Sequence, residues 1–208
     1  SNYGKSYYPS DYSPNAGWAD YYGNEDFFKA YPNDDRKEWN YMTEWKIKSG
    51  EIIPYTESAD KLPAISKYYD YDEGAPGKSA QSNGITCIYR YAEVLLMYAE
   101  ASTRATNSVN QDALNAIQEV QKRAGYQNRQ IELTTTTEPA AFLTAVSNER
   151  GWEFFAEMKR WFELVRLEKV KEVRAEEWDA STFNTNHHYY FPVPYQQVDL
   201  AGWTNNAG

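Results

Sequence analysis

The sequence predicts a mostly α-helical protein with little strand, in which a tetratricopeptide-like helical hairpin and a long third helix accompany extensive irregular loops. Apolar residues recur at helical spacing between residues 88 and 170. Residues 1–85 are instead rich in Tyr, Asp, Asn, Pro and Gly and show little helical period. We therefore expect a loop-rich, aromatic-rich segment over 1–85, followed by a helical scaffold and an extended tail over 86–208.

The first predicted helix runs from Arg90 to about Arg104. Apolar residues three and four apart would share one face of this helix; they are Tyr91, Val94, Leu95, Tyr98 and Ala101. The second helix begins after Asn110 as N-cap and ends at Gly125, whose position suits a left-handed C-terminal residue. Its inward residues are Leu114, Ile117 and Val120. The short connection between the two helices predicts an antiparallel hairpin.

The third predicted helix is the longest, with Thr137 as its cap, Pro139 in its first turn and an end near Leu167. Its apolar stripe comprises Phe142, Val146, Trp152, Phe155, Met158, Phe162 and Val165, and Gly151 would weaken it locally. Strands are expected only as short runs at 51–55 and 85–88. Pro192 and Pro194 predict that the tail at 189–200 packs as coil. Cys87, just before the first helix, is expected to be a small buried residue.

Composition narrows the possible partners. The formal net charge of -9 would repel a phosphate backbone, and the chain has no run of five or more Lys and Arg, so no nucleic-acid partner is expected. No window approaches the roughly 18 consecutive apolar residues of a membrane-spanning helix. Aromatic residues make up 16% of the chain, a proportion that favours recognition surfaces built from amphipathic rings.

Three segments resemble the C-terminal part of SusD/RagB-family proteins in order and spacing. They are RYAEVLLMYAEA at 90–101, NERGWEFFAEMKRWFELVR at 148–166 and YYFPVPYQQVDL at 189–200. FFKAYPNDDRKEW at 27–39 also resembles the family's stretch that leads to an Asp-Arg pair. The resemblance implies a helical, non-enzymatic, lipid-anchored nutrient-binding protein on the bacterial outer membrane, which acts with a TonB-dependent SusC-like transporter and captures glycans.

Members of that family are typically more than twice this length, with a signal peptide, a lipid-modified cysteine and further tetratricopeptide-like helices ahead of the matching region. We therefore interpret the chain as a C-terminal fragment. A single helical hairpin of a repeat array leaves a face that neighbouring helices would cover, since about three repeats are needed to bury a continuous core.

A glycan site needs flat rings for stacking on sugar faces and polar side chains that bind hydroxyl groups. The predicted loop at 13–26 contains both. Its candidate ligand-binding residues are Trp18, Tyr21, Tyr22, Asn15, Asp20 and Asn24. Trp39 and Trp45, which follow a charged stretch, are further candidates. The alternative interpretation is that the rings only seal the helical domain.

Catalysis and metal binding find little support. Glu149, Glu153 and Glu157 lie four apart on one helix face, whereas glycoside hydrolases place two carboxyl groups across a cleft. We expect Glu153 and Glu157 to form ion pairs with the nearby Lys159, Arg160 and Arg166 on a solvated helix face, so that the motif is structural. His187 and His188 are adjacent and would point to opposite sides, so no metal site is predicted. The sequence also lacks nucleotide-binding glycine motifs, and no cofactor is expected.

The favoured hypothesis is therefore non-catalytic capture of an oligosaccharide by aromatic stacking, as part of a nutrient-uptake system. The alternative is a module that binds a peptide or a protein, because RagB-like members of the same family suggest peptides and an exposed tetratricopeptide-like face would suit a partner helix.

Overall fold

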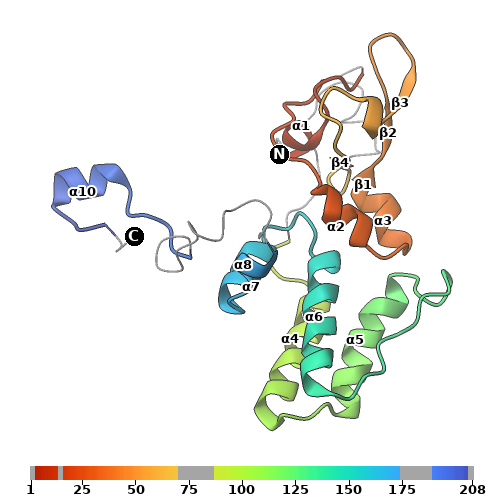
Figure 1. Ribbon diagram of the computed structural model, residues 1–208, viewed down its shortest axis with the longest axis vertical. Helices are drawn as coiled ribbons and strands as arrows, with labels where there is room; N and C mark the ends of the chain where they lie inside the picture. Colours follow the sequence, from red (N-terminus) through yellow and green to blue (C-terminus); the bar gives the residue numbers. More distant parts are fainter. Residues whose placement is uncertain (1–2, 14–15, 70–86, 174–188, 206–208) are drawn as a thin grey trace. The chain divides into compact units, whose positions relative to one another are not determined.

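The computed structural model describes residues 3–13, 16–69, 87–173 and 189–205, and the chain divides into two compact units, Ser1–Ala156 and Glu157–Gly208 (Figure 1). The helices of the first unit are α1 (Tyr3–Tyr7), α2 (Glu25–Ala30), α3 (Asp35–Asn40), α4 (Tyr91–Thr106), α5 (Gln111–Arg123) and α6 (Pro139–Glu153). Those of the second are α7 (Arg160–Arg166), α8 (Val170–Val173) and α10 (Tyr195–Ala201). The predicted mostly helical class is confirmed. No helix among the described residues has the length and apolar character needed to cross a bilayer.

The strands of the described residues form two small antiparallel sheets near the N-terminus. β1 (Tyr41–Met42) pairs with β4 (Ala64–Ile65), and β2 (Glu44–Lys46) pairs with β3 (Ile52–Pro54). β3 confirms the strand predicted at 51–55. The run predicted at 85–88 is not a strand over Cys87 and Ile88, and its first two residues lie outside the described residues.

Helices α4, α5 and α6 lie side by side and enclose the apolar core (Figure 1). The core residues are Leu96, Ala99, Ala113, Leu114, Ala116, Ile117, Val120, Phe142, Val146 and Phe154. The predicted ends of α5 are confirmed: the Asn110 side chain accepts a hydrogen bond from the Ala113 amide, and Gly125 has φ of 84° just beyond the helix. Leu114, Ile117 and Val120 are all buried, so the apolar stripe predicted the buried face of α5 correctly.

Most of the apolar face predicted for α4 is its outer face, although Leu95 is half-buried against the core. Tyr91 and Val94 are 66% and 51% exposed, and Tyr98 and Ala101 are exposed as well. The opposite face carries Leu96 and Ala99 into the core together with two buried acids, Glu93 and Glu100. Because α4 is apolar on both faces, periodicity alone could not decide which one is buried.

The prediction of one long third helix is wrong in two respects. Its N-cap is Glu138, whose carboxylate accepts from the amides of Ala140 and Ala141, rather than Thr137. The helix ends at Glu153, and the backbone turns through positive φ angles at Ala156 and Met158 before α7 begins. Met158 and Phe162, which were predicted to belong to one continuous stripe, are mostly exposed.

The C-terminal tail and the cysteine also differ from expectation. Pro194 is extended, as predicted, but it precedes the short helix α10 instead of further coil. A proline just before a helix lacks only an amide hydrogen that would have no partner within that helix, so it permits this start. Cys87 is exposed and not buried.

Candidate functional site

The loop that carries the predicted ligand-binding residues is fixed to α1 by its backbone. Every amide from residue 17 to residue 21 donates a hydrogen bond to a carbonyl within residues 5–9, at 2.6 to 3.2 Å. Gly17 lies so close to this partner that a Cβ there would be 1.9 Å from the Tyr8 carbonyl oxygen. The loop is therefore a paired segment whose side chains project from a defined backbone.

Two aromatic side chains project outward from this paired segment. Trp18 and Tyr21 are 53% and 55% exposed. The Tyr21 ring lies 5.5 Å from the buried Tyr7 ring, which stacks at 16° on the ring of Tyr68. Lys5 places its ammonium group 5.0 Å from the Trp18 ring centroid. We call Trp18, Tyr21, Tyr7 and Tyr68 the aromatic platform; it presents two ring surfaces to solvent and supports one of them with a further pair of rings.

The other residues predicted for this loop take different roles. The Tyr22 hydroxyl donates to Asp60, and burial together with this carboxylate raises the pKa of Tyr22. Asn24 caps α2 by accepting a hydrogen bond from the Phe27 amide at 2.9 Å. Asp20 is exposed on the loop between Trp18 and Tyr21. The structure thus leaves Asp20 exposed, while Asn15 lies outside the described residues.

The two further tryptophans predicted as candidates have opposite environments. Trp39 is 63% exposed at the end of α3. Trp45 is only 3% exposed and donates its indole N–H to Asp11 at 2.7 Å. Trp45 is therefore a core residue that cannot stack on a ligand, whereas the Trp39 ring is accessible.

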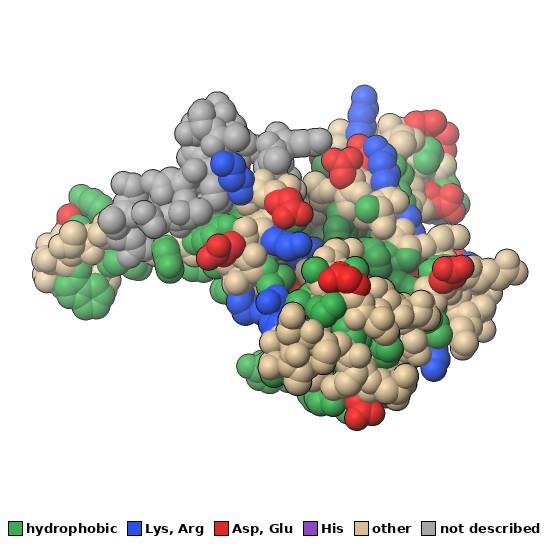
Figure 2. Space-filling view, turned by 60° about the horizontal axis from the view of Figure 1, so that its bottom comes forward, with side chains coloured by type: hydrophobic (Ala, Val, Ile, Leu, Met, Phe, Trp, Pro, Cys, Tyr) green, Lys and Arg blue, Asp and Glu red, His purple; other side chains and the backbone are tan. Residues whose placement is uncertain are grey.

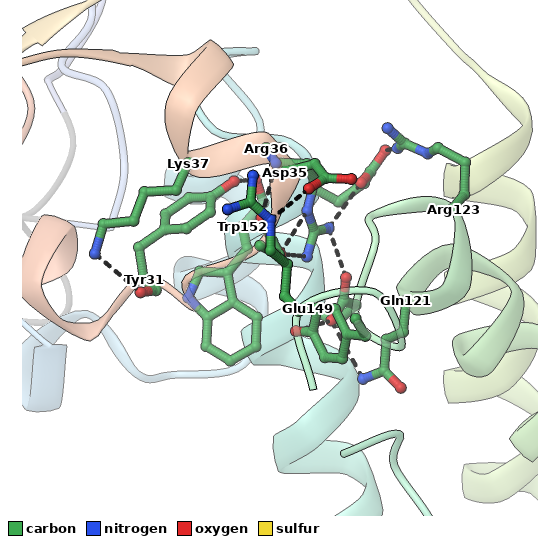
Figure 3. A network of polar contacts seen from close by, with 12 residues as sticks. Tyr31, Asp35, Arg36, Lys37, Gln121, Arg123, Glu149 and Trp152 are labelled. Atoms are coloured by element: carbon green, nitrogen blue, oxygen red, sulfur yellow. Dashed lines mark hydrogen bonds and ion pairs between the residues drawn. The ribbon is translucent and has the colours of Figure 1, made fainter. Parts of the chain in front are cut away.

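The first unit has a buried polar centre that the sequence did not predict. Arg36 is 6% exposed and donates to Asp34 in its own segment, at 2.6 and 3.0 Å. The same guanidinium donates to Glu149 at 2.6 Å and to Glu153 at 2.8 Å, both on α6. Figure 3 shows Arg36 pointing from α3 toward Glu149, which Gln121 reaches from α5. This network joins the N-terminal segment to the helical bundle.

The network balances its own charge. Three guanidinium groups meet three carboxylates; the groups belong to Arg36, Arg90, Arg123, Asp34, Glu149 and Glu153. The Tyr126 hydroxyl donates to Glu149 at 3.1 Å, and Arg90 also donates to the Glu153 carbonyl at 2.6 Å. Buried charges persist when they are paired and hydrogen-bonded, and this arrangement meets both conditions.

The prediction that Glu153 lies on a solvated helix face is wrong, and Glu149 on the same helix is buried as well. Both are at most 2% exposed, because they continue the buried stripe that Phe142 and Val146 begin. The spacing of Phe142, Val146, Glu149 and Glu153 was the sequence signal that could have revealed this. Their partner, Arg36, lies more than a hundred residues away, in the Asp-Arg stretch noted in the sequence, where nothing local links it to these glutamates.

Burial and charge act differently on the two carboxyl groups. Burial raises the pKa of Glu149 above its ordinary value, and Arg36 opposes this shift only in part. Burial would also raise the pKa of Glu153, but Arg90, Arg123 and Arg36 together lower it. Both carboxylates lie on adjacent turns of α6 and accept hydrogen bonds from Arg36, so each already has an arginine partner.

Metal binding has no candidate in the part of the chain that the structure describes, where no three His, Cys, Asp or Glu side chains are grouped to hold an ion. His187 and His188 lie outside the described residues.

Known proteins share this fold and sequence pattern. SusD-like protein P2 of Formosa agariphila is 28% identical over 183 residues, which cover 80% of this chain and 36% of that protein. A crystal structure of a SusD superfamily protein from Parabacteroides distasonis has a TM-score of 0.79 at 22% identity, over 100% of this chain and 46% of its own. The surface glycan-binding protein A from Bacteroides uniformis has a TM-score of 0.69 at 22% identity, over 99% of this chain and 46% of its own.

The chain thus spans about a third of the length of that curated relative and under half of each of these structures. At these identities the two solved structures establish the fold alone. The family is established by a model described as "SusD family", which matches residues 1–206. Together with the helical architecture, this match shows that the chain belongs to the SusD family.

Proposed function

We propose that this chain is the glycan-binding part of a cell-surface nutrient-uptake protein and that the aromatic platform contacts the sugar. The observation that carries the proposal is the pair of half-exposed rings, Trp18 and Tyr21, on a loop whose backbone is fixed to α1. A fold shared with a surface glycan-binding protein supports the same assignment.

Capture at the platform follows from the chemistry of a pyranose ring. The axial C–H groups of a sugar form an apolar face that packs on an aromatic ring, and burial of this apolar surface favours binding by about 25 cal/mol per Å². Asp20, which is exposed and lies between Trp18 and Tyr21 in the sequence, can accept hydrogen bonds from sugar hydroxyl groups. Because the loop is already paired with α1, little backbone entropy is lost on binding.

We propose that the protein captures its ligand without turning it over. Acid–base cleavage of a glycoside requires two carboxyl groups facing each other across a cleft. Glu149 and Glu153 instead share Arg36 inside the molecule, at most 2% exposed. A substrate would have to displace a buried guanidinium to reach either carboxylate.

The cellular setting is a further part of this proposal and rests on family membership. In the complete protein, the chain would belong to a lipid-anchored receptor at the outer-membrane surface. It would pass oligosaccharides to a TonB-dependent SusC-like transporter.

Affinity electrophoresis through gels that contain a panel of neutral and acidic polysaccharides tests the binding proposal. The parent chain, Trp18→Ala and Trp203→Ala are run in parallel. Trp203 is a matched control because it is also more than half exposed, at 58%, but belongs to the other compact unit. We expect one glycan to retard the parent and Trp203→Ala while Trp18→Ala migrates freely.

Two other outcomes would overturn parts of the proposal. Equal retardation of all three proteins would keep glycan binding and reject the platform as its site. Free migration of all three in every gel would reject glycan binding by this chain. Selection of a displayed peptide library for binding to the same immobilised proteins would then test the RagB-like alternative.

A further inference from the structure

A half-buried cation lies beside the aromatic platform. Lys5 belongs to α1, and its ammonium group lies over the Trp18 ring, 5.0 Å from the centroid. Within the described residues this ammonium group forms no ion pair and no hydrogen bond. Because taking a charge out of water costs free energy that a partner must offset, the position favours an oxygen atom supplied by another molecule.

The other partly or fully buried cations of the first unit all have an oxygen partner, as far as the structure describes the chain. Three guanidinium groups form ion pairs with glutamates, and two ammonium groups donate to backbone carbonyls. These cations are Arg36, Arg90, Arg150, Lys37 and Lys67. Lys5 therefore differs from them in its lack of an oxygen partner, and it lies at the proposed ligand surface.

The two exposed rings of the platform carry further donors. In the described part of the chain, the Trp18 indole N–H and the Tyr21 hydroxyl form no hydrogen bond, whereas the indole of the buried Trp45 donates to Asp11. A carboxylate or a sulfate ester accepts hydrogen bonds and donates none, and its bonds to a cationic donor are stronger than those of a neutral acceptor. The donors at the platform therefore match an anionic substituent on a sugar.

Long-range attraction does not supply such a preference. The chain has a formal net charge of -9, and Figure 2 shows Lys and Arg side chains interspersed with Asp and Glu on the described part of the face in view. Asp20 is exposed in the same loop and forms no ion pair with Lys5. Because charges more than about 8 Å away are largely screened at physiological ionic strength, a preference for acidic ligands must come from the local contact with Lys5.

The same cation controls access to the Trp18 ring. The cation–π contact places the Lys5 ammonium group over the ring that the sugar needs for stacking. A charge-assisted hydrogen bond is stronger than a cation–π contact at an exposed ring, so an anionic group draws the ammonium group off the ring and uncovers it. A neutral sugar offers only hydroxyl groups, which compete less well for the ammonium group.

We propose that the aromatic platform selects acidic glycans and that Lys5 is its specificity-determining residue. Lys5 donates to a carboxylate or sulfate group of the glycan while a pyranose ring packs on Trp18. This inference rests on the proposed function, since it needs a glycan at the platform, and it adds the chemical class of that glycan.

Matched pairs of polysaccharides that differ in charge test this inference. One pair is polygalacturonate and its methyl ester, and the other is κ-carrageenan and its desulfated form. Affinity electrophoresis over a range of polysaccharide concentrations gives a dissociation constant for each polymer. We expect the parent to bind the acidic member of one pair at least about fivefold more tightly than the neutral member. The pair that shows this preference distinguishes a carboxylate ligand from a sulfate ligand.

Three variants isolate the contribution of the ammonium group. Lys5→Met keeps the apolar stem and removes the charge, and Lys5→Arg keeps a cationic donor. Lys48→Met is the matched control, because it removes the same charge from an exposed position between β2 and β3. We expect Lys5→Met to bind both members of the pair alike, and the other two variants to keep the preference of the parent within about twofold. Circular dichroism verifies that all four proteins are folded.

Two results would overturn this inference and leave the proposed function standing. The parent could bind both members of each pair equally, or the preference for the acidic member could persist in Lys5→Met. In either case the platform remains the glycan site if Trp18→Ala loses the binding. Free migration of the parent in all four polymers would also overturn the inference, and the proposed function would fail with it only if every gel of the wider panel gave the same result.

Discussion

The helical bundle and the N-terminal segment of the first unit are held together by different kinds of interaction. The core of α4, α5 and α6 consists of Leu, Ile, Val, Ala and Phe side chains. In residues 3–69 the large buried side chains are mainly aromatic, and several satisfy a polar atom as well: Tyr31 donates its hydroxyl to the Trp152 carbonyl, and Trp45 donates to Asp11. The bundle depends on apolar periodicity, whereas the N-terminal segment depends on particular polar partners.

The junction between the two regions combines both kinds of interaction. Arg36 comes from the N-terminal segment, and its partners Glu149 and Glu153 occupy the buried face of α6. The aromatic platform belongs to the N-terminal segment, so this junction keeps the proposed ligand site attached to a rigid scaffold. If this comparison is correct, loss of a buried polar partner should cost more than loss of an exposed one.

Replacement of Arg36 with Met should have the largest effect on stability. It leaves the carboxylates of Asp34, Glu149 and Glu153 without the cation they share, and breaking a buried ion pair in this way costs about 3–5 kcal/mol. Urea denaturation monitored by circular dichroism measures the change in the free energy of unfolding.

The matched control for that variant is Arg129→Met. Arg129 pairs with Asp35 and Glu38 at the surface, where an ion pair contributes about 0–1 kcal/mol. Equal losses in the two variants would show that the buried network is no more important than a surface pair.

Replacement of Gly125 with Ala should have the next largest effect. The residue has φ of 84°, and a Cβ would lie 2.2 Å from the Asp35 carboxylate, which Arg129 holds. The left-handed backbone alone costs about 1 kcal/mol for alanine, and displacement of Asp35 adds to it. Thermal melts should therefore show a larger loss than for Gly50→Ala, where φ is 94° and the nearest atom is 3.9 Å away. The difference should vanish when Asp35 is also changed to Ala.

Glu149 and Glu153 should have opposite effects on how the free energy of unfolding changes at acidic pH. The pKa of Glu153 is lowered in the folded state. Its contribution to the free energy of unfolding is therefore present above its pKa in the unfolded chain and is lost as pH falls through its pKa in the folded protein. The pKa of Glu149 is raised in the folded state. Its contribution to the free energy of unfolding is therefore present below its pKa in the unfolded chain and is lost as pH rises through its pKa in the folded protein.

Unfolding free energies measured from pH 3 to pH 7 test these signs. Relative to the parent, Glu153→Gln should show a shallower loss of stability toward low pH, and Glu149→Gln a steeper one. Parallel curves for both variants would mean that neither carboxyl group has a perturbed pKa.

Replacement of Tyr41 with Phe should have the smallest effect. The Tyr41 side chain is buried among aromatic rings, and its hydroxyl has no hydrogen-bond partner in the described part of the chain. Removing it should leave stability unchanged or raise it by up to about 1 kcal/mol. Tyr31→Phe is the control, because it removes a hydroxyl that donates to Trp152 and accepts from Asn40, and it should destabilise. Equal destabilisation by both changes would show that the Tyr41 hydroxyl has a partner.

The sequence predicted most where a single local rule decided the structure. Asn110 and Gly125 bound α5 as expected, because capping and a left-handed C-terminal residue depend only on neighbouring residues. The α4 face and the end of α6 could not be predicted, because both depend on contacts far along the chain. Glu153 ends α6 where Arg90, Arg123 and Arg36 converge on it.

The candidate site was predictable in part for the same reason. Loop composition pointed to Trp18 and Tyr21, and both are exposed. It could not distinguish them from Tyr22, Asn24 and Trp45, whose side chains are engaged by Asp60, the α2 backbone and Asp11. Pairing of the loop with α1 is a backbone property that side-chain types do not encode.

Isothermal titration of the retarding glycan into the parent, Trp18→Ala and Trp203→Ala tests the central claim most directly. Loss of the Trp18 ring should weaken binding about tenfold or more, while Trp203→Ala stays within about twofold of the parent. The melting temperatures of the three proteins should agree, because both rings are mostly exposed. An unchanged affinity in a folded Trp18→Ala protein would contradict the assignment of the ligand site to the aromatic platform.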